Sequence, residues 1–310
     1  MPHISLRHPV AAGALLIAAF FSAPAARAQT FDEAIPSGAN FDKAEFRLWY
    51  PAGVARVQGV VVIVPGSNGD WRAMAQDTVW QAFATRNKLA LVGCRFTDKP
   101  HDQSFIEDYV NVSKGSGQAL LDAMTAFASR ANHAELATAP FLMWGMSAGG
   151  QVNYEFVAWK PERVLAFVVN KGGIYYTALT SRASRNVPGI LFTGGKDLES
   201  RVNTITGLFE VNRRGSALWA LANEPGIGHA VGRSRDLTMM FFEDLLPLRI
   251  GADGALRTLE EKSGFLGDLK AKTFQPMGDM RAPSVATAWL PTERVARAWQ
   301  AVVTEKPFGQ

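Results

Sequence analysis

The chain contains a single cysteine, Cys94, in 310 residues. This excludes a disulfide-stabilised scaffold and a zinc site built from cysteines. Charged residues make up only 19% of the chain and hydrophobic residues 47%, which excludes an intrinsically disordered protein. Beyond the N-terminal segment, no apolar run approaches the roughly 18 residues that a membrane-spanning helix requires. The length and composition therefore indicate a globular chain with a sizeable core, in which Cys94 packs as a small hydrophobic side chain.

The first 28 residues have the features of an export signal. Arg7 provides a positive charge, residues 10–21 are apolar or small, and residues 26–28 form an Ala-x-Ala cleavage site. We therefore expect a periplasmic or extracellular protein with no membrane attachment after cleavage. Removal of the signal takes away two arginines and no acidic residue, so the net charge falls from +4 to +2. This balance, without a dense basic cluster, argues against a nucleic-acid partner.

Short apolar segments alternate with amphipathic ones between residues 45 and 250. The apolar segments predict strands, the first of them at a sheet edge because its polar and apolar residues alternate. The amphipathic segments, such as 118–128 and 151–159, predict helices. This order indicates an α/β fold, with a mostly parallel central sheet and helices on both faces, in a single catalytic domain over residues 29–250. The expected strands are 46–50, 57–64, 88–94, 141–144, 164–170, 189–193 and 217–222.

Residues 145–149 read Gly-Met-Ser-Ala-Gly, directly after the expected strand 141–144 and before the expected helix 151–159. A Gly-x-Ser-x-Gly sequence in this context is typical of a nucleophile elbow. The serine occupies a strained turn that aims its hydroxyl away from the sheet, and the flanking glycines leave room for that turn. A glycine-rich turn without chemistry is the alternative. We predict that Ser147 is a nucleophile.

A serine nucleophile needs a base and an acid that orients the base. Only one histidine follows Ser147, and it lies just past the last expected strand, so His229 is the predicted base. Asp197, in the loop after strand 189–193, is the predicted acid, with Glu199 as the alternative. The mechanism calls for no cofactor and no metal. The five histidines of the chain are His3, His8, His101, His133 and His229.

An oxyanion hole requires two N–H groups near the nucleophile. One is expected from Ala148, which follows the serine, and the second from the loop after strand 57–64. That loop reads Pro-Gly-Ser-Asn-Gly-Asp over residues 65–70. Ser67 is the preferred donor and Asn68 the alternative, unless the segment is an ordinary Asn-Gly turn.

These motifs, in the chain order Ser147, Asp197, His229, resemble the α/β-hydrolase superfamily over residues 45–250. The Gly-Met-Ser-Ala-Gly-Gly elbow, the Pro-Gly-Ser loop and the export signal are similar to those of secreted serine esterases. These include polyhydroxyalkanoate depolymerases, feruloyl or acetyl esterases and cutinase-like polyesterases. Dienelactone hydrolases are less similar because they carry cysteine at the nucleophile position. The chain departs from cutinase-like enzymes in its single cysteine and from minimal hydrolases in its longer C-terminal segment.

Only 18 residues, 171–188, separate two expected strands where such folds insert a lid. This length predicts an open site suited to bulky or polymeric esters. Four aromatic residues follow strand ends, where ligands bind in such sheets, and they are candidates for substrate contacts although aromatic side chains more often fill cores. They are Trp71, Phe96, Tyr175 and Tyr176.

The C-terminal extension, residues 251–310, ends in an amphipathic segment. Val295, Ala298, Trp299 and Val302 fall on one helical face, so we expect a helix docked on the hydrolase body.

Three functions are compatible with these residues. The first is a serine esterase that forms an acyl-enzyme. The second is a peptidase of the same fold, against which the absence of a large cap speaks. The third is a binding protein that kept the fold without catalysis, against which the intact triad order speaks.

Overall fold

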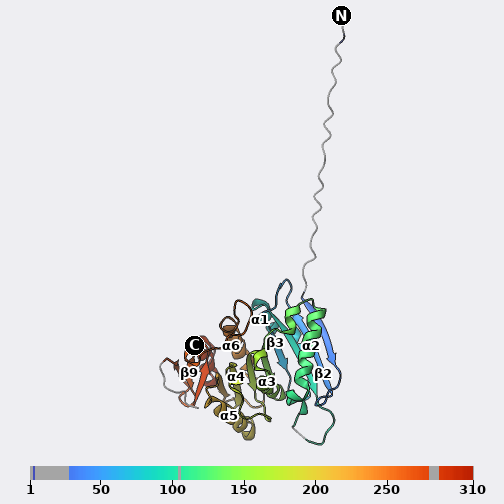
Figure 1. The fold of residues 1–310 in the computed structure, drawn as a ribbon. Helices are drawn as coiled ribbons and strands as arrows, with labels where there is room; N and C mark the ends of the chain where they lie inside the picture. The colour runs from blue at the N-terminus through green and yellow to red at the C-terminus, as the bar shows by residue number, and fades with distance from the viewer. Residues whose placement is uncertain (1–2, 4–27, 104–105, 279–285, 310) are drawn as a thin grey trace.

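The computed structural model describes residues 3, 28–103, 106–278 and 286–309. Its centre is an eight-stranded sheet in the order β1-β2-β4-β3-β5-β6-β7-β8 (Figure 1). β2 pairs antiparallel with both β1 and β4, and every pairing from β4 onward to β8 is parallel. The strands are β1 (Gln29–Ile35), β2 (Lys43–Tyr50), β3 (Gly59–Val64), β4 (Leu89–Thr97), β5 (Phe141–Met146), β6 (Val164–Asn170), β7 (Gly189–Gly194) and β8 (Trp219–Glu224).

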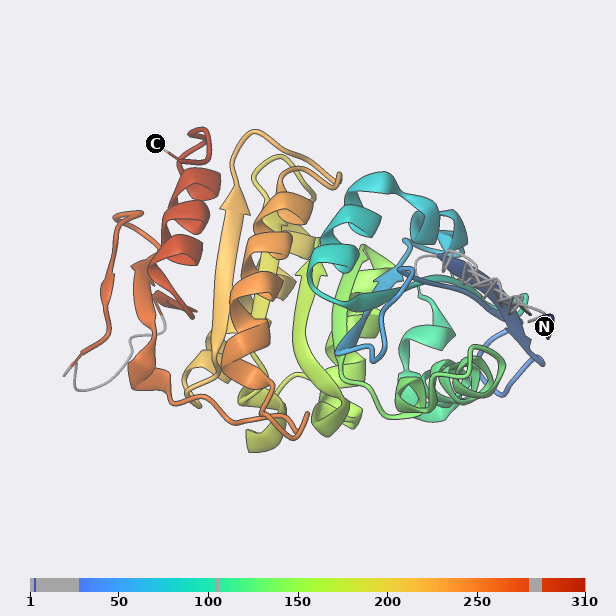
Figure 2. The same cartoon turned by 90° about the horizontal axis from the view of Figure 1, so that it is seen from above.

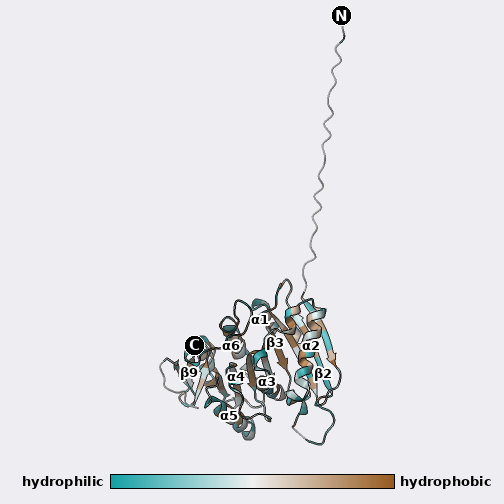
Figure 3. Ribbon diagram, viewed as in Figure 1, coloured by the Kyte–Doolittle hydropathy of each residue, from teal (hydrophilic) through white to brown (hydrophobic). Residues whose placement is uncertain are grey.

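Helices cover both faces of this sheet (Figure 2). Successive residues of a strand point to opposite faces, so Val60 and Val62 enter one core and Val61 and Ile63 the other. Figure 3 shows the central strands as the brown, hydrophobic part of the fold. The first face carries α2 (Ser116–Arg130), α3 (Ala148–Trp159) and α5 (Glu199–Arg213), and the second α1 (Thr78–Arg86), α6 (Ser234–Arg249) and α7 (Glu293–Val303).

Short helical turns occupy the connections. Between β6 and β7 the described chain forms only the four-residue helix α4 (Arg182–Arg185), so no lid domain is inserted there. The 3-10 turns are Arg72–Gln76, Asp108–Val110, Val112–Lys114, Ala134–Ala137, Pro161–Arg163 and Glu261–Ser263.

The predicted α/β architecture is confirmed, with a correction at one edge of the sheet. The strand around 46–50 is not an edge strand, because β2 pairs with β1 on its other side. β1 was missed because its charged residues Asp32 and Glu33 interrupt a short run next to the expected cleavage site. Cys94 is fully buried, as its apolar neighbours indicated.

The C-terminal segment lies at the other end of the sheet, beside β8 (Figure 2). It adds a three-stranded sheet in the order β10-β9-β11, followed by α7. The Thr292 side chain caps α7 by accepting a hydrogen bond from the Val295 N–H. The Trp299 indole N–H donates a 2.8 Å hydrogen bond to the Leu221 carbonyl of β8. The strands are β9 (Phe265–Asp268), β10 (Phe274–Pro276) and β11 (Thr287–Leu290).

Apart from His3 and Ala28, the expected export signal lies outside the described residues. Within the described ranges, none of the helices has both the length and the apolar character needed to cross a membrane.

Candidate active site

The site lies where the strand order reverses. From β3 the chain crosses to β4 on one side, whereas from β5 it proceeds to β6 on the other. Such a reversal opens a crevice at the carboxyl ends of the two central strands. The loop 65–70 leaves the carboxyl end of β3, and Ser147 leaves that of β5.

Ser147 occupies a turn that few residues other than glycine adopt, with φ 55° and ψ −123°. The turn brings the two flanking glycines close together. A Cβ atom on Gly145 would lie 2.4 Å from the Gly149 backbone, and one on Gly149 would lie 2.2 Å from the Val64 carbonyl oxygen. The glycines are therefore required by the close approach of backbone segments, and the structure places Ser147 at the tip of a nucleophile elbow.

Two further residues from separate loops meet Ser147. His229 follows β8, and its Nε2 atom lies 3.0 Å from the Ser147 Oγ atom. Asp197 follows β7, and its Oδ2 atom lies 3.0 Å from the His229 Nδ1 atom. This Ser-His-Asp relay has the hydrogen-bond geometry that lets an imidazole accept the serine proton while a carboxylate orients the ring.

The Asp197 carboxylate is held in its ionised form. Its side chain is 2% exposed, and Oδ1 accepts a 2.7 Å hydrogen bond from the Leu198 N–H and another from Arg201. Burial raises the pKa of Asp197, but the hydrogen bonds from His229 and Leu198 and the charge of Arg201 outweigh burial and lower it. Glu199 is exposed and makes no hydrogen bond to His229. The geometry therefore favours Asp197 over Glu199 as the acid.

The candidate oxyanion donors lie on the two sides of Ser147. Ala148 begins α3, whose N-terminus favours negative charge. Among the described residues, neither its N–H nor that of Ser67 has a hydrogen-bond acceptor. The Asn68 N–H, in contrast, donates a 3.1 Å hydrogen bond to the Tyr109 hydroxyl oxygen. Ser67 rather than Asn68 is therefore free to contribute the second donor.

A cavity of about 560 Å³ opens over the serine and the histidine. Its lining is mostly polar and comes from loops and from the first turns of α3 and α5, with the apolar side chains of Ile174 and Leu198 among them. His229 is 36% exposed, so solvent and substrate reach the imidazole. The lining residues are Ser67, Glu107, Ser147, Gln151, Gly173, Ile174, Leu198, Ser200, Arg201, Thr204 and His229.

None of the four predicted aromatic contacts lines this cavity. Phe96 is 2% exposed on β4 and packs edge-on against Phe46, so it belongs to the core. Trp71 stacks on Trp144 at a ring-centroid distance of 5.4 Å. Tyr175 is half-buried and packs edge-on against Tyr154.

Tyr176 is exposed, but it lines a neighbouring cavity of about 400 Å³. Its backbone N–H donates a 2.7 Å hydrogen bond to the carboxylate of Glu155. Burial and the charges of nearby carboxylates, first Asp108 and then Asp98, raise the pKa of Tyr176. The surface around Tyr176 therefore carries several carboxylates.

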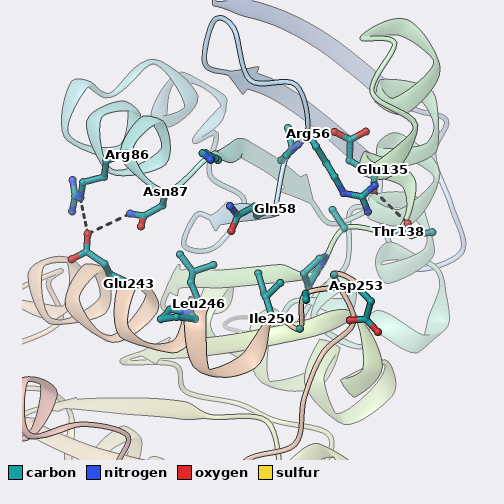
Figure 4. A pocket seen from close by; sticks show the side chains of 18 residues that line it. Arg56, Gln58, Arg86, Asn87, Glu135, Thr138, Glu243, Leu246, Ile250 and Asp253 are labelled. Carbon is teal, nitrogen blue, oxygen red and sulfur yellow. Dashed lines mark hydrogen bonds and ion pairs between the residues drawn. The ribbon is translucent and has the colours of Figure 1, made fainter.

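A larger cavity, of about 880 Å³, lies at the opposite ends of the strands, and Figure 4 shows the side chains that line it. Gln58 and Lys88 line it just before β3 and β4, so it is at the amino ends of the strands. Its Glu243 is paired with Arg86 at 2.8 Å. No member of the Ser147 relay reaches this cavity, and we assign it no catalytic part.

No group of histidine, cysteine and acidic side chains suited to a metal ion occurs within the described ranges.

The chain matches no protein-family model and no curated protein sequence. Solved structures do resemble it. A ferulic acid esterase has a TM-score of 0.51 and 9% sequence identity, with 72% of this chain and 98% of that chain covered. The apoenzyme of S-formylglutathione hydrolase (FrmB) from Staphylococcus aureus has a TM-score of 0.51, 11% identity and the same coverage. Together with the sheet order and the elbow, these similarities show that the chain has the α/β-hydrolase fold.

Proposed function

We propose that this protein is a serine esterase that hydrolyses carboxylic esters through an acyl-enzyme. The observation that carries the proposal is the pair of 3.0 Å hydrogen bonds that links Ser147, His229 and Asp197 at an exposed cavity. The two similar structures, named as a ferulic acid esterase and an S-formylglutathione hydrolase, support this proposal.

In the proposed mechanism His229 removes the proton from the Ser147 hydroxyl as its oxygen attacks the ester carbonyl carbon. The N–H groups of Ala148 and Ser67 stabilise the negative charge on the carbonyl oxygen. His229 then gives the proton to the leaving alkoxide, which departs as the alcohol. Water attacks the acyl-enzyme in the same way, and the acid is released with Ser147 restored. Asp197 keeps the imidazole in the required tautomer throughout.

The absence of an inserted lid between β6 and β7 favours bulky or polymeric substrates. We propose in addition that the protein is exported, with cleavage after Ala28. Mass spectrometry of the protein recovered from a cell envelope fraction should find Gln29 as the first residue. A chain that keeps residues 1–28 in the cytoplasm would contradict export without affecting the proposed chemistry.

The decisive experiment for the esterase proposal compares the intact protein with Ser147→Ala on p-nitrophenyl acetate and butyrate. We expect the variant to lose hydrolysis and labelling by a fluorophosphonate probe while its circular dichroism stays unchanged. Ser129→Ala, which removes a hydroxyl from the exposed side of α2, is the matched control and should keep full activity. Residual activity in Ser147→Ala equal to that of the control would overturn the proposal, and faster cleavage of an amide than of the matching ester would favour a peptidase.

A further inference from the structure

Glu107 is a nearly buried carboxylate without a partner. The residue is 7% exposed and lies just before the turn Asp108–Val110. Its carboxylate makes no hydrogen bond and no ion pair with any described residue, and its oxygens are not sealed from solvent. Because these oxygens remain accessible and have no partner in the protein, a positively charged group that enters the cavity can form a charge-assisted hydrogen bond with them.

Glu107 belongs to the lining of the cavity over Ser147. Glu107 and Ser67 line both the cavity over Ser147 and a second cavity of about 560 Å³ beside it. The substrate that reaches the serine therefore occupies a space bounded by Glu107.

The other charges around the cavity leave Glu107 uncompensated. Arg201 lines the same cavity, but its guanidinium is paired with Asp197. In the second cavity His101 lies 3.5 Å from Asp98 and so is directed to a different carboxylate. Lys99 lines the second cavity without an ion pair to Glu107 within 4.0 Å.

The chain around Glu107 adds further negative charge. Asp108 follows it directly, and the carboxylates of Asp98, Glu107 and Asp108 all act on Tyr176. None of the described cationic side chains thus forms an ion pair with Glu107, whereas several nearby acids reinforce a negative potential that attracts a cation.

We propose that Glu107 is a specificity-determining residue that selects esters carrying a positively charged amino group. The inference rests on the proposed esterase function, since the amino group would bind Glu107 while the ester lies at Ser147. An ammonium group forms a stronger hydrogen bond to a carboxylate than a neutral hydroxyl does. Glu107 should therefore favour an amino ester over a hydroxyl ester as well as over an ester without a donor.

Matched esters test this directly. Methyl 4-(aminomethyl)benzoate carries the cation, methyl 4-ethylbenzoate is its uncharged counterpart of the same shape, and methyl 4-(hydroxymethyl)benzoate offers a neutral donor. The meta isomers of all three extend the range of distances. We expect kcat/KM for at least one amino ester to exceed that of its ethyl counterpart by about tenfold at low salt, and to decline as salt rises.

Variants assign the preference to Glu107. Glu107→Gln should bring the amino-to-ethyl ratio of kcat/KM to within about twofold. Glu107→Asp should keep part of the preference. Asp102→Asn removes the same charge from an exposed position of the same loop, outside both cavities, and should leave the ratio unchanged.

Binding separates this inference from the esterase proposal. In Ser147→Ala, calorimetry should show tighter binding of the amino ester than of the ethyl ester, and the difference should vanish when Glu107→Gln is added. Equal ratios for amino and ethyl esters in the unaltered protein would overturn the inference, as would equal preference for the hydroxymethyl ester or a preference that survives Glu107→Gln. Selective binding of the amino ester without hydrolysis of any ester would instead overturn the esterase proposal alone.

Discussion

The Nζ atom of Lys171 lies 2.5 Å from the Oε2 atom of Glu224, and both side chains are almost fully buried. Glu224 ends β8, and its other oxygen, Oε1, accepts a 2.6 Å hydrogen bond from the Arg233 N–H. This hydrogen bond joins the two ends of the loop that carries His229, because Glu224 precedes the loop and Arg233 follows it. Lys171 neutralises the carboxylate that makes this tie, so a charge at the carboxyl end of β6 supports the position of the imidazole.

Lys171→Met should therefore destabilise the fold and lower kcat. Removing one partner of a buried pair leaves an uncompensated charge, which costs about 3–5 kcal/mol of the free energy of unfolding. Urea denaturation measures the loss, and ester hydrolysis well below the midpoint measures the effect on His229. Lys262→Met, from an exposed pair with Glu260, is the matched control and should cost less than about 1 kcal/mol. Equal stability of the two variants would show that the buried pair does not support the loop.

Asp197→Asn should reduce kcat by on the order of 10⁴-fold with little change in stability, because an amide favours the wrong tautomer of His229. Glu199→Gln makes the same change in the exposed neighbour and should keep activity within about twofold. Steady-state hydrolysis of a p-nitrophenyl ester provides the comparison. If the larger loss were found in Glu199→Gln, the acid would have been misassigned.

Gly69→Ala tests whether the loop 65–70 supplies a donor to the oxyanion. A backbone N–H remains when a side chain is removed, so the substitution has to change the shape of the loop. A Cβ atom at Gly69 would lie 2.9 Å from the Pro65 Cβ atom and 3.0 Å from the Gly66 carbonyl oxygen, so the loop must shift. We expect kcat to fall by about 10²-fold as the Ser67 N–H leaves its position. Gly207→Ala, in open space on α5, is the control and should keep both activity and stability. Unchanged kcat in Gly69→Ala would argue against a donor from this loop.

The carboxyl group of Glu243 makes the free energy of unfolding depend on pH. Burial raises the pKa of Glu243, but hydrogen bonds from Arg86 and Arg294 outweigh burial and bring it to about 2. A folded-state pKa below the unfolded value means that the stabilisation is complete above about pH 4.5 and is lost as the pH falls toward 2. Chemical denaturation between pH 2 and 6 should show a smaller pH slope for Glu243→Gln than for the unaltered protein.

The control for this slope is Glu162→Gln, whose carboxylate lies in an exposed pair with Lys160. It should keep the pH dependence of the unaltered protein. Parallel curves for the unaltered protein and Glu243→Gln would contradict the assignment, because the carboxylate would then titrate equally in the folded and unfolded states.

The sheet, and the meeting of Ser147, His229 and Asp197, could be predicted because chemistry and chain order restrict both. His229 is the only histidine that follows Ser147 in the chain, and an elbow needs a strand before it and a helix after it. The aromatic contacts could not be predicted in this way. Trp71 follows β3 and Phe96 lies near the end of β4, and whether such a ring enters the core or a cleft depends on packing partners that are distant in sequence.

The charged residues that shape the site were also missed. Arg201 reaches Asp197 from four residues along the chain, in the first turn of α5, whereas Glu224 at the end of β8 meets Lys171 just after β6, with β7 between them. The first pair depends on the local turn that starts α5, and the second on the strand order of the completed sheet. Glu107 gave no signal of its own, because a single acid in a polar loop is ordinary until its burial and lack of a partner are known.

The hydrogen bond from Trp299 to Leu221 has a consequence for self-association. β8 is the last strand of the sheet, and an open strand edge is a template for pairing with another chain. The indole occupies a carbonyl on that edge while α7 covers the strand beside it. The C-terminal segment thereby covers part of this edge, so residues well away from Ser147 leave less of β8 open to pairing with a second chain.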